Sequence, residues 1–379
     1  MPYTFSLPGT GDLSTDQRFA LKTEPKDVFI ISGCPGSGKT TVALLRSKGK
    51  GSNSKFHYTV WANMLYGYLL NVSNQLEVSE SHFSTFWSWF YRNFKYVDFK
   101  NPSRIAQTLH GARVMFDELQ LDEGQDIDIE IRTALASLSK KMIICMDPAQ
   151  DVNGTCNEFE DEIKKTIRYL ESQGKTPRHI RLDVNWRNTQ QIFSFSKSII
   201  PEINSSIQIS RFVKQGDKPK LFKLDGQNII FEKIIEIIKE ESGRNIGILS
   251  DRTTELKSLQ NHLSSKNISS TRYCTREHRQ RTSTEKKEFL TSMQNVILST
   301  FISCKGLEFD IVIFLDISNF SDEFKKKKGY YVGATRALTK LIMFKDTSNY
   351  SLPSWFNRIE NSLYDEIGSS NSFDENPIF

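Results

Sequence analysis

The chain has 379 residues, of which 38% are hydrophobic and 26 are phenylalanines. This apolar content excludes wholesale disorder, and the length leaves room for two α/β domains of ordinary size. The net charge of +5 and the isoelectric point near 8.7 permit a polyanionic partner but do not require one.

The N-terminal half alternates between apolar strands and helical stretches. A capped helix start at residues 13–17 precedes five strand candidates, at residues 28–31, 56–60, 118–121, 142–146 and 179–184. Residues 61–71 have a helical pattern, and an aromatic cluster follows at residues 83–91. Strands separated by helices favour a parallel sheet with crossover helices. We therefore expect an N-terminal lobe over residues 1–184, with a small insertion near residues 61–110.

The same alternation begins again after residue 185. The strand candidates of this half lie at residues 220–224, 246–250, 295–300, 311–316 and 341–345. The clearest helices between them cover residues 229–241 and 255–263. The pattern predicts a second α/β lobe over residues 185–365, without a glycine-rich loop of its own. We expect the last thirty or so residues to form a helix and then a flexible tail at residues 366–379.

Residues 33–40 read G-C-P-G-S-G-K-T and lie between the first strand and a helix start. This is the G-x-x-x-x-G-K-[ST] pattern in the context of a phosphate-binding loop, and the alternative is a chance glycine-rich turn. Glycines let backbone N–H groups point at an anion near the positive end of a helix. Lys39 can then reach the phosphates of ATP, and the Thr40 hydroxyl can ligate Mg²⁺. The candidate nucleotide-binding residues of this segment are Gly33, Gly36, Ser37, Gly38, Lys39 and Thr40.

Two pairs of acids lie near the third strand candidate. Asp122 and Glu123 follow the strand, where the first acid would hold Mg²⁺ and the second would polarise the attacking water. A competing pair, Asp117 and Glu118, lies upstream, and either pair can be a solvated strand end. We prefer Asp122 and Glu123 because a Gln-Asp pair follows them. Gln150, after the fourth strand, can sense a γ-phosphate, although the Asp-Pro before it alone indicates only a turn.

The chain resembles a superfamily 1 helicase of the UvrD/Rep type. The matching motifs extend over most of its length and occur in the order typical of the family. The segments that carry the resemblance are the loop at 33–40, D-E-G-Q-D at 122–126, D-P-A-Q at 147–150, N-W-R-N at 185–188, K-G-L-E-F at 305–309 and Y-V-G-A-T-R-A at 331–337. The joint match is specific, because the last two segments rarely occur together by chance. The resemblance implies an α/β fold of two RecA-like parallel-sheet lobes with short helical insertions, which binds ATP and Mg²⁺.

The resemblance also implies roles for single residues. Gln17 stands where the family reads adenine, Trp186 where an aromatic ring stacks on adenine, and Glu308 where an acid meets the ribose. Arg187 and Arg336 match the two arginines that contact the γ-phosphate. Arginine suits a transferring phosphoryl group because its planar fork donates two hydrogen bonds and stays charged. A surface salt bridge is the alternative for each arginine alone; together they predict a nucleotide in a cleft between the lobes.

Helicases of this family grip a single strand across both lobes, through phosphate contacts and base stacking. The matching candidates are Thr59, Trp61, Asn63, Thr85, Phe86, Trp87 and Thr300. For the aromatic residues, burial in the core is an equal alternative. Basic clusters at residues 325–328, and at Arg272, Arg276, Arg279, Arg281 and residues 286–287, either track phosphates or form solvated faces.

The departures from the family concern the nucleic-acid side. No aromatic residue follows Gln150 directly, Ile302 replaces a usual histidine, and the stretch between residues 188 and 300 is too short for a large accessory domain. We expect an ATP-dependent translocase or helicase, which by family analogy moves 3′→5′ on single-stranded DNA rather than RNA. The alternative is an ATP-switched regulatory subunit of a nuclease or of an anti-phage defence complex, without processive unwinding.

The cysteines and the N-terminus indicate the compartment. The cysteines are scattered and never form C-x-x-C, which suggests a reducing environment and no zinc site; they are Cys34, Cys145, Cys156, Cys274 and Cys304. The N-terminus has no signal-peptide pattern, and no stretch approaches the length of a membrane span. We expect a soluble, cytoplasmic protein without a membrane partner.

Overall fold

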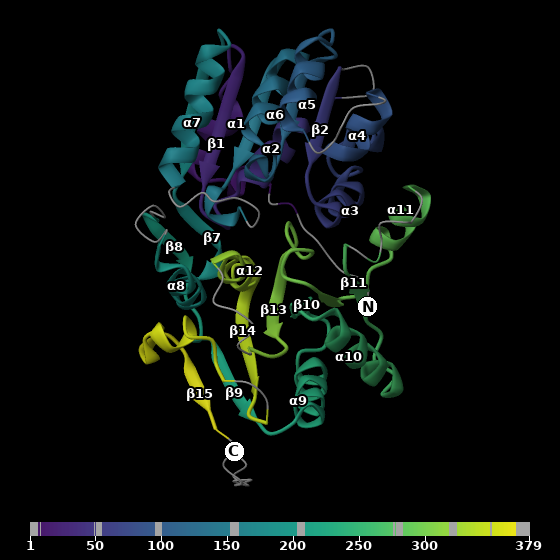
Figure 1. Cartoon of the computed structure of the whole chain (residues 1–379), viewed down its shortest axis with the longest axis vertical. Helices are drawn as coiled ribbons and strands as arrows, with labels where there is room; N and C mark the ends of the chain where they lie inside the picture. The colour runs from purple at the N-terminus through teal and green to yellow at the C-terminus, as the bar shows by residue number, and fades with distance from the viewer. Residues whose placement is uncertain are drawn as a thin grey trace.

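Two parallel sheets, one above the other in Figure 1, organise the chain. The computed structural model describes residues 7, 9–48, 50, 55–94, 101–151, 159–202, 209–275, 277, 283–317, 324–348 and 351–368. We call the part around the six-stranded sheet the first lobe and the part around the seven-stranded sheet the second lobe.

The sheet of the first lobe has the strand order β3-β2-β4-β5-β1-β6, and every neighbouring pair is parallel. Its strands are β1 (Val28–Gly33), β2 (Phe56–Val60), β3 (Phe83–Thr85), β4 (Phe116–Leu121), β5 (Ser139–Met146) and β6 (Pro177–Leu182). β1 is buried throughout, because helices cover both faces of the sheet, and it therefore reads as a continuous apolar run. Its side chains alternate between the faces: Ile30 joins one apolar cluster, and Phe29 and Ile31 join another.

Several helices of the first lobe begin at a residue whose side chain caps them. The helices of this lobe are α1 (Thr15–Lys22), α2 (Lys39–Ser47), α3 (Asn63–Val72), α4 (Phe86–Asn93), α5 (Pro102–His110), α6 (Ile129–Ala134) and α7 (Phe159–Ser172). Ser14 and Gln17 form a reciprocal capping box at the start of α1, and the Thr85 side chain caps α4. The capping box confirms the predicted helix start and fixes Gln17 in the first turn.

The sheet of the second lobe has the order β11-β12-β10-β13-β14-β9-β15, again with parallel neighbours. Its strands are β9 (Lys220–Leu224), β10 (Ile246–Leu249), β11 (Thr271–Tyr273), β12 (Val296–Ser299), β13 (Phe309–Phe314), β14 (Ala337–Asp346) and β15 (Asp365–Ile367). A separate parallel pair is formed by β7 (Val184–Thr189) and β8 (Arg211–Lys214). The helices are α8 (Gln190–Ile199), α9 (Gln227–Glu240), α10 (Thr253–Ser265), α11 (Ser283–Thr291) and α12 (Phe324–Ala334).

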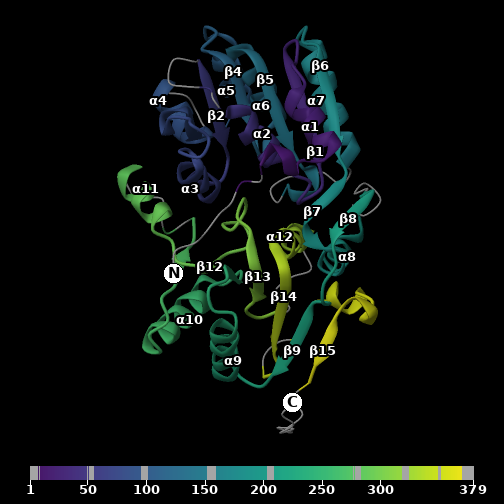
Figure 2. The ribbon, with the colours of Figure 1, turned by 180° about the vertical axis from the view of Figure 1, so that it is seen from behind.

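The two lobes touch along α3. Helix α11 projects from the second lobe and packs against α3, as both views show (Figures 1 and 2). A Cβ atom at Gly67 of α3 would lie 2.6 Å from the Cβ of Leu290 on α11, so only glycine permits this approach. A Cβ atom at Gly306, in the loop after β12, would lie 2.7 Å from the Cβ of Leu65 on α3. The packing of α3 therefore depends on both lobes.

The α/β prediction with parallel sheets is confirmed, and each strand candidate overlaps an observed strand. The run at residues 179–184 divides, since β6 ends at Leu182 and β7 begins at Val184. The predicted boundary between residues 184 and 185 therefore falls at the start of β7 and stays a prediction. The helix expected near the C-terminus is wrong, because the described residues 351–368 form 3-10 turns and β15. Residues 369–379 lie outside the described part of the chain.

Within the described ranges, no helix combines the length and the hydrophobicity needed to cross a membrane.

Candidate nucleotide site

The loop between β1 and α2 approaches the second lobe closely. Gly36 and Gly38 have positive φ angles of 77° and 88°, a conformation that favours glycine. A Cβ atom at Gly36 would lie 2.5 Å from the Cβ of Arg187 on β7. The hydroxyl of Ser37 is buried and has no hydrogen-bond partner among the described residues.

Lys39, the first residue of α2, folds back onto the loop. Its ammonium Nζ donates to the carbonyl oxygens of Gly33 and Cys34, both at 2.9 Å, and lies 3.6 Å from Oδ2 of Asp147 after β5. The two carbonyl groups are neutral, so an anionic phosphate competes with them favourably for the ammonium.

Gln17 braces the same loop. Its Oε1 accepts a hydrogen bond from the Ser14 N–H at 2.9 Å, and its Nε2 donates to the Ser37 carbonyl at 2.9 Å. A side chain at position 38 would collide with the Gln17 amide. Both ends of this amide are engaged by the protein, so the predicted reading of adenine by Gln17 stays a prediction.

Asp122 follows β4 and lies beside Thr40. The Tyr58 hydroxyl donates to Oδ2 of Asp122 at 3.0 Å, and the Thr40 hydroxyl bonds to the same carboxyl group. Burial raises the pKa of Asp122 to about 6, and the neighbouring charge of Glu123 acts in the same direction. A buried carboxylate of this kind, next to a hydroxyl, suits a hard divalent cation.

Glu123 has a left-handed backbone, with φ of 55°, which is uncommon outside glycine and asparagine. The Gln125 amide donates to its Oε2 at 2.5 Å. Burial disfavours the charged form of Glu123, but the positive charges of Lys305, Arg336 and Lys39 outweigh it and lower the pKa of this carboxyl group. Glu123 therefore stays ionised at neutral pH.

The competing pair of acids lies at the other end of β4. Asp117 is exposed and pairs with Lys140 at 2.8 Å. Glu118 pairs with Lys50 at 2.5 Å, at the amino end of the strand. Asp117 therefore forms a surface ion pair and Glu118 a largely buried one, and neither acid lines the pocket around Lys39.

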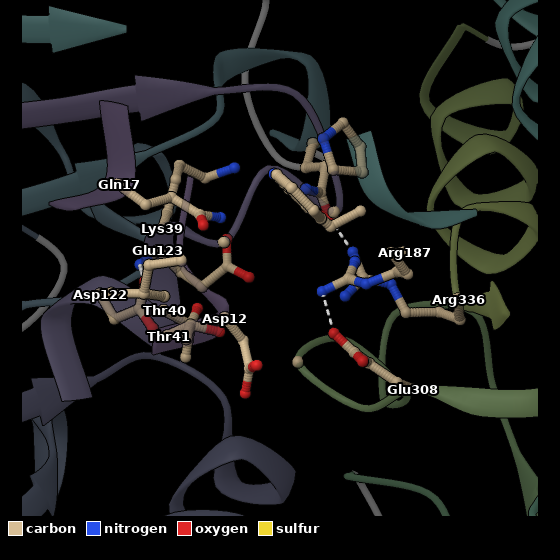
Figure 3. A pocket seen from close by; sticks show the side chains of 17 residues that line it. Asp12, Gln17, Lys39, Thr40, Thr41, Asp122, Glu123, Arg187, Glu308 and Arg336 are labelled. Carbon is tan, nitrogen blue, oxygen red and sulfur yellow. Dashed lines mark hydrogen bonds and ion pairs between the residues drawn. The ribbon is translucent and has the colours of Figure 1, made fainter. Parts of the chain in front are cut away.

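Two arginines face the loop from the second lobe (Figure 3). Arg187 on β7 forms an ion pair with Glu308, and Arg336 after α12 donates to Oε1 of Gln150. Burial lowers the pKa of the Arg336 guanidinium, and the charge of Arg187 contributes further. Two cations held close together in a buried site repel each other, so an anion between them would stabilise both.

A cavity of about 380 Å³ opens between these groups, within the usual size range of ligand pockets. Its lining comes from both lobes: Asp12, Leu13, Gln17, Pro35, Gly36, Gly38, Lys39, Thr40, Thr41, Asp122, Glu123, Gln150, Trp186, Arg187, Gly306, Glu308 and Arg336. Of the nucleotide-site candidates, Gly33 and Ser37 are the two that do not line it. Trp186 is half-buried, and the guanidinium of Arg211 lies 5.8 Å from the centre of its ring.

Lys305 and Asp126 form a buried ion pair between the lobes that the sequence patterns do not predict. Nζ of Lys305 lies 2.7 Å from both carboxylate oxygens of Asp126, 2.8 Å from the carbonyl oxygen of Gln150 and 3.9 Å from Oε2 of Glu123. Burial raises the pKa of Asp126 to about 7 even though the charge of Lys305 opposes that shift. Both residues belong to motif segments, but they are 179 positions apart, so only the fold reveals the contact.

The nucleic-acid candidates of the first lobe lie at the ends of β2 and β3. Trp61 and Trp87 are half-buried and meet edge to face, with ring centres 5.8 Å apart. Phe86 is fully buried by the packing of α4 onto the sheet, which agrees with the alternative of burial in the core, and its predicted stacking on a base stays a prediction. Thr59 is also buried, and Thr85 serves as the helix cap of α4.

The remaining candidates lie where α3 meets the second lobe. The Asn63 side chain hydrogen-bonds to Tyr273 on β11. The Thr300 hydroxyl donates to Ser303 at 2.8 Å, and Ile302 between them is 54% exposed. These positions flank the contact between the lobes, and their predicted role in nucleic-acid binding stays a prediction.

The basic clusters offer less free charge than the sequence indicates. Lys328 is fully buried, and Lys327 is 8% exposed and bonds to Glu202 at 3.0 Å. Arg272 pairs with Glu277 at 2.5 Å. Arg276, Arg279 and Arg281 lie outside the described residues. The side chains of Lys286, Lys287 and Lys325 are also outside the described part of the structure. The segment at 152–158, which includes Cys156, is also outside the described residues.

Comparisons with known proteins show the fold. No protein-family model and no curated protein matches the chain. The structure of S. cerevisiae Dbp5 bound to RNA and ADP BeF3 is similar over 94% of this chain and 90% of that one, with 11% sequence identity and a TM-score of 0.54. A variant of Dbp5 with the same ligands gives a TM-score of 0.53, at the same identity and coverage.

A third structure covers one lobe. The C-terminal domain of a possible DNA helicase from Lactobacillus plantarum is similar over 48% of this chain and 98% of that one, with 20% identity and a TM-score of 0.35. The likeness to Dbp5, which extends over both lobes, confirms the predicted fold class of two RecA-like parallel-sheet lobes.

Proposed function

We propose that this chain is a nucleic-acid-dependent ATPase of the helicase type. More narrowly, we propose a compact member of the UvrD/Rep class of superfamily 1. The observation that carries the proposal is the cavity of about 380 Å³, which Lys39 and Glu123 face from the first lobe and Arg187 and Arg336 face from the second (Figure 3). The fold shared with Dbp5, whose structure holds RNA and ADP BeF3, agrees with this proposal.

The first lobe would bind the nucleotide, and the second lobe would complete the binding site. Lys39 turns from the loop carbonyls to the β- and γ-phosphates. Mg²⁺, held through Thr40 and Asp122, would neutralise charge on the β- and γ-oxygens. Trp186 offers its ring to the adenine.

Glu123 orients and polarises the attacking water, because its lowered pKa keeps it ionised at neutral pH. Arg187 and Arg336 stabilise the charge that develops on the γ-phosphoryl group as the bond to the β-phosphate breaks. Gln150 lies between Asp147 and Arg336 and reports on the same phosphate. Loss of the γ-phosphate releases both arginines, so the cleft reopens and the lobes move.

The single strand would cross both lobes near α3. Trp61 and Trp87 are half-buried aromatic residues of the first lobe whose rings contact each other, and Thr300 is the candidate of the second lobe. Half-exposed rings stack on bases of any sequence, which suits a translocase. We propose single-stranded DNA as the track and 3′→5′ as the direction, by analogy with the UvrD/Rep class.

The test is the steady-state ATPase rate with and without single-stranded DNA and RNA, over a series of salt concentrations. We expect single-stranded nucleic acid to raise the rate, and salt to weaken the effect as counterion release requires. Trp87→Ala should weaken nucleic-acid binding and leave the unstimulated rate intact, whereas Tyr169→Ala, at an exposed ring on α7, serves as the control.

A second candidate is an ATP-switched regulatory subunit that controls a partner, such as a nuclease, without processive unwinding. It is favoured by the burial of Phe86, Thr59 and Lys328, which reduces the surface available to a nucleic acid. ATP hydrolysis that does not respond to either nucleic acid, together with no binding at low salt, would support this candidate over the first.

A further inference from the structure

A chain of buried contacts links the phosphate loop to the second lobe through Asp147. Nζ of Lys39 lies 3.6 Å from Oδ2 of Asp147, and Nε2 of Gln150 donates to the same oxygen at 2.7 Å. Oε1 of Gln150 in turn accepts a hydrogen bond from Arg336. Asp147, Gln150 and Arg336 are each 3% exposed or less. One carboxylate therefore connects the lysine of the first lobe with the arginine of the second.

Two polar atoms beside this chain lack partners. Oδ1 of Asp147 and the hydroxyl of Tyr331 are buried, and neither has a hydrogen-bond partner among the described residues. They belong to different lobes, since Asp147 follows β5 and Tyr331 lies on α12, which packs against the turn at Pro148–Gln150. Burial raises the pKa of the Tyr331 hydroxyl, and the negative charge of Asp147 is the next cause. An unpaired acceptor and an unpaired donor on facing elements favour any small movement that joins them.

We propose that Asp147 is a positioning residue that exchanges Lys39 for Tyr331 when a nucleotide binds. The proposal rests on the proposed function. A phosphate draws Lys39 away from Asp147, and a buried carboxylate that loses its cation requires a new donor. Tyr331 is the unpaired donor on α12, the helix that packs against the turn directly after Asp147. The new bond would pull α12 toward the first lobe, and Arg336 at the end of that helix would move toward the γ-phosphate.

The exchange explains why a buried tyrosine hydroxyl is left unpaired in this part of the fold. It also gives the protein a way to sense phosphate before hydrolysis: occupancy at Lys39 is converted into closure of the second lobe. Gln150 remains bonded to Oδ2 throughout, so the exchange changes one partner of Asp147 at a time.

The test uses Tyr331→Phe, which removes only the hydroxyl. Without nucleotide, its free energy of unfolding should equal or exceed that of the parent, because the lost hydroxyl has no partner. Its dissociation constant for Mg²⁺ and a non-hydrolysable ATP analogue should rise about tenfold, the value of one hydrogen bond to a charged group. Tyr330→Phe is the matched control: Tyr330 is equally buried but packs against Phe301 and Trp355.

Asp147→Asn completes a double-mutant cycle. If Tyr331 acts through this carboxylate, Tyr331→Phe should change the affinity by less than about twofold in the Asp147→Asn background. A Tyr331→Phe protein that binds the analogue as the parent does would overturn the exchange and leave the proposed function intact. An equal effect of Tyr331→Phe in both backgrounds would also overturn it. A parent that binds no analogue would refute the proposed function, and the exchange with it.

Discussion

At the scale of single residues, each cation of the candidate site already has a partner of its own. Lys39 contacts carbonyl oxygens, Arg187 pairs with Glu308, and Arg336 donates to Gln150. The carbonyl oxygens and the Gln150 amide are neutral, and Glu308 carries a single charge, so a triphosphate can displace these partners from the side chains that they hold in place. Preorganisation of this kind lowers the cost of ordering the site when the ligand arrives.

The first prediction separates binding from chemistry at this site. Glu123→Gln keeps the size and hydrogen bonds of the side chain but removes the charge that polarises water, so hydrolysis should fall by about 10²-fold or more. Its affinity for ATP should stay within about twofold of the parent. Lys39→Ala should lose affinity as well as activity. The measurement pairs calorimetric ATP binding with the steady-state rate; an unchanged rate in Glu123→Gln would remove the base assignment.

The second prediction concerns His57 on β2, which bonds to the Ser84 hydroxyl at 2.7 Å. Burial lowers the pKa of His57 to about 3, with the charge of Arg92 as the next cause. Between pH 6.5 and 3, His57 is therefore protonated in the unfolded chain but neutral in the folded chain. The free energy of unfolding consequently falls as the pH falls. The loss should be about 2 kcal/mol between pH 6.5 and pH 5.

His57→Gln keeps a polar side chain that can hydrogen-bond to Ser84 and cannot titrate, so it is the control for this effect. Denaturant unfolding at pH 7 and pH 5 should show a smaller loss for the variant than for the parent. Equal losses in the two proteins would mean that His57 already takes up its proton in the folded state.

At the scale of elements, the ion pair between Lys305 and Asp126 connects the loop before β13 with the turn after β4. The third prediction is that Lys305→Met destabilises the protein by roughly 3 to 5 kcal/mol at pH 8, because it leaves a buried carboxylate without its cation. The double variant with Asp126→Asn should recover a large part of that loss. Urea unfolding measures both; a double variant that loses the sum of the single effects would contradict the coupling.

The elements that the sequence predicts are those with a long apolar run. Strands such as β1 and β5 carry a clear pattern, whereas β3, β11 and β15 have three residues each and too little pattern to detect. β15 reads Asp-Glu-Ile and is exposed along its length, so it holds its place by pairing with β9 alone. Short edge strands of this kind depend on their neighbours rather than on their own side chains.

The candidate site divides in the same way. The phosphate loop, Asp122 and Glu123 follow from local patterns, and the structure places them around one cavity. The sequence does not show which of Phe86 and Trp87 is buried. Consecutive residues at a helix start point in different directions, and only the packing of the helix decides which side chain lies inside. The hydrogen-bond partners of Lys305 lie in the other lobe, 155 and 179 positions away in the chain, so no local pattern predicts them.

At the scale of the whole molecule, the two lobes meet at the cavity and again along α3, where Leu290 of α11 packs on Gly67. Movement of one lobe against the other must therefore disturb both contacts. The fourth prediction is that Gly67→Leu, which adds bulk at this approach, separates α11 from α3 and lowers the ATPase rate by about tenfold, because the arginines reach the nucleotide less often. Gly368→Leu should not change the rate, since a Cβ there would contact nothing and the φ angle is not positive.

The central claim is that a triphosphate lies between the lobes and that both arginines of the second lobe contact it. The most direct test is a crystal structure of the chain with Mg²⁺ and a non-hydrolysable ATP analogue. In that structure we expect Arg187 to leave Glu308 and Arg336 to leave Gln150. Both guanidinium groups should then lie within hydrogen-bond distance of the γ-phosphate. A bound analogue in a closed cleft, with the arginines still on Glu308 and Gln150, would contradict the claim.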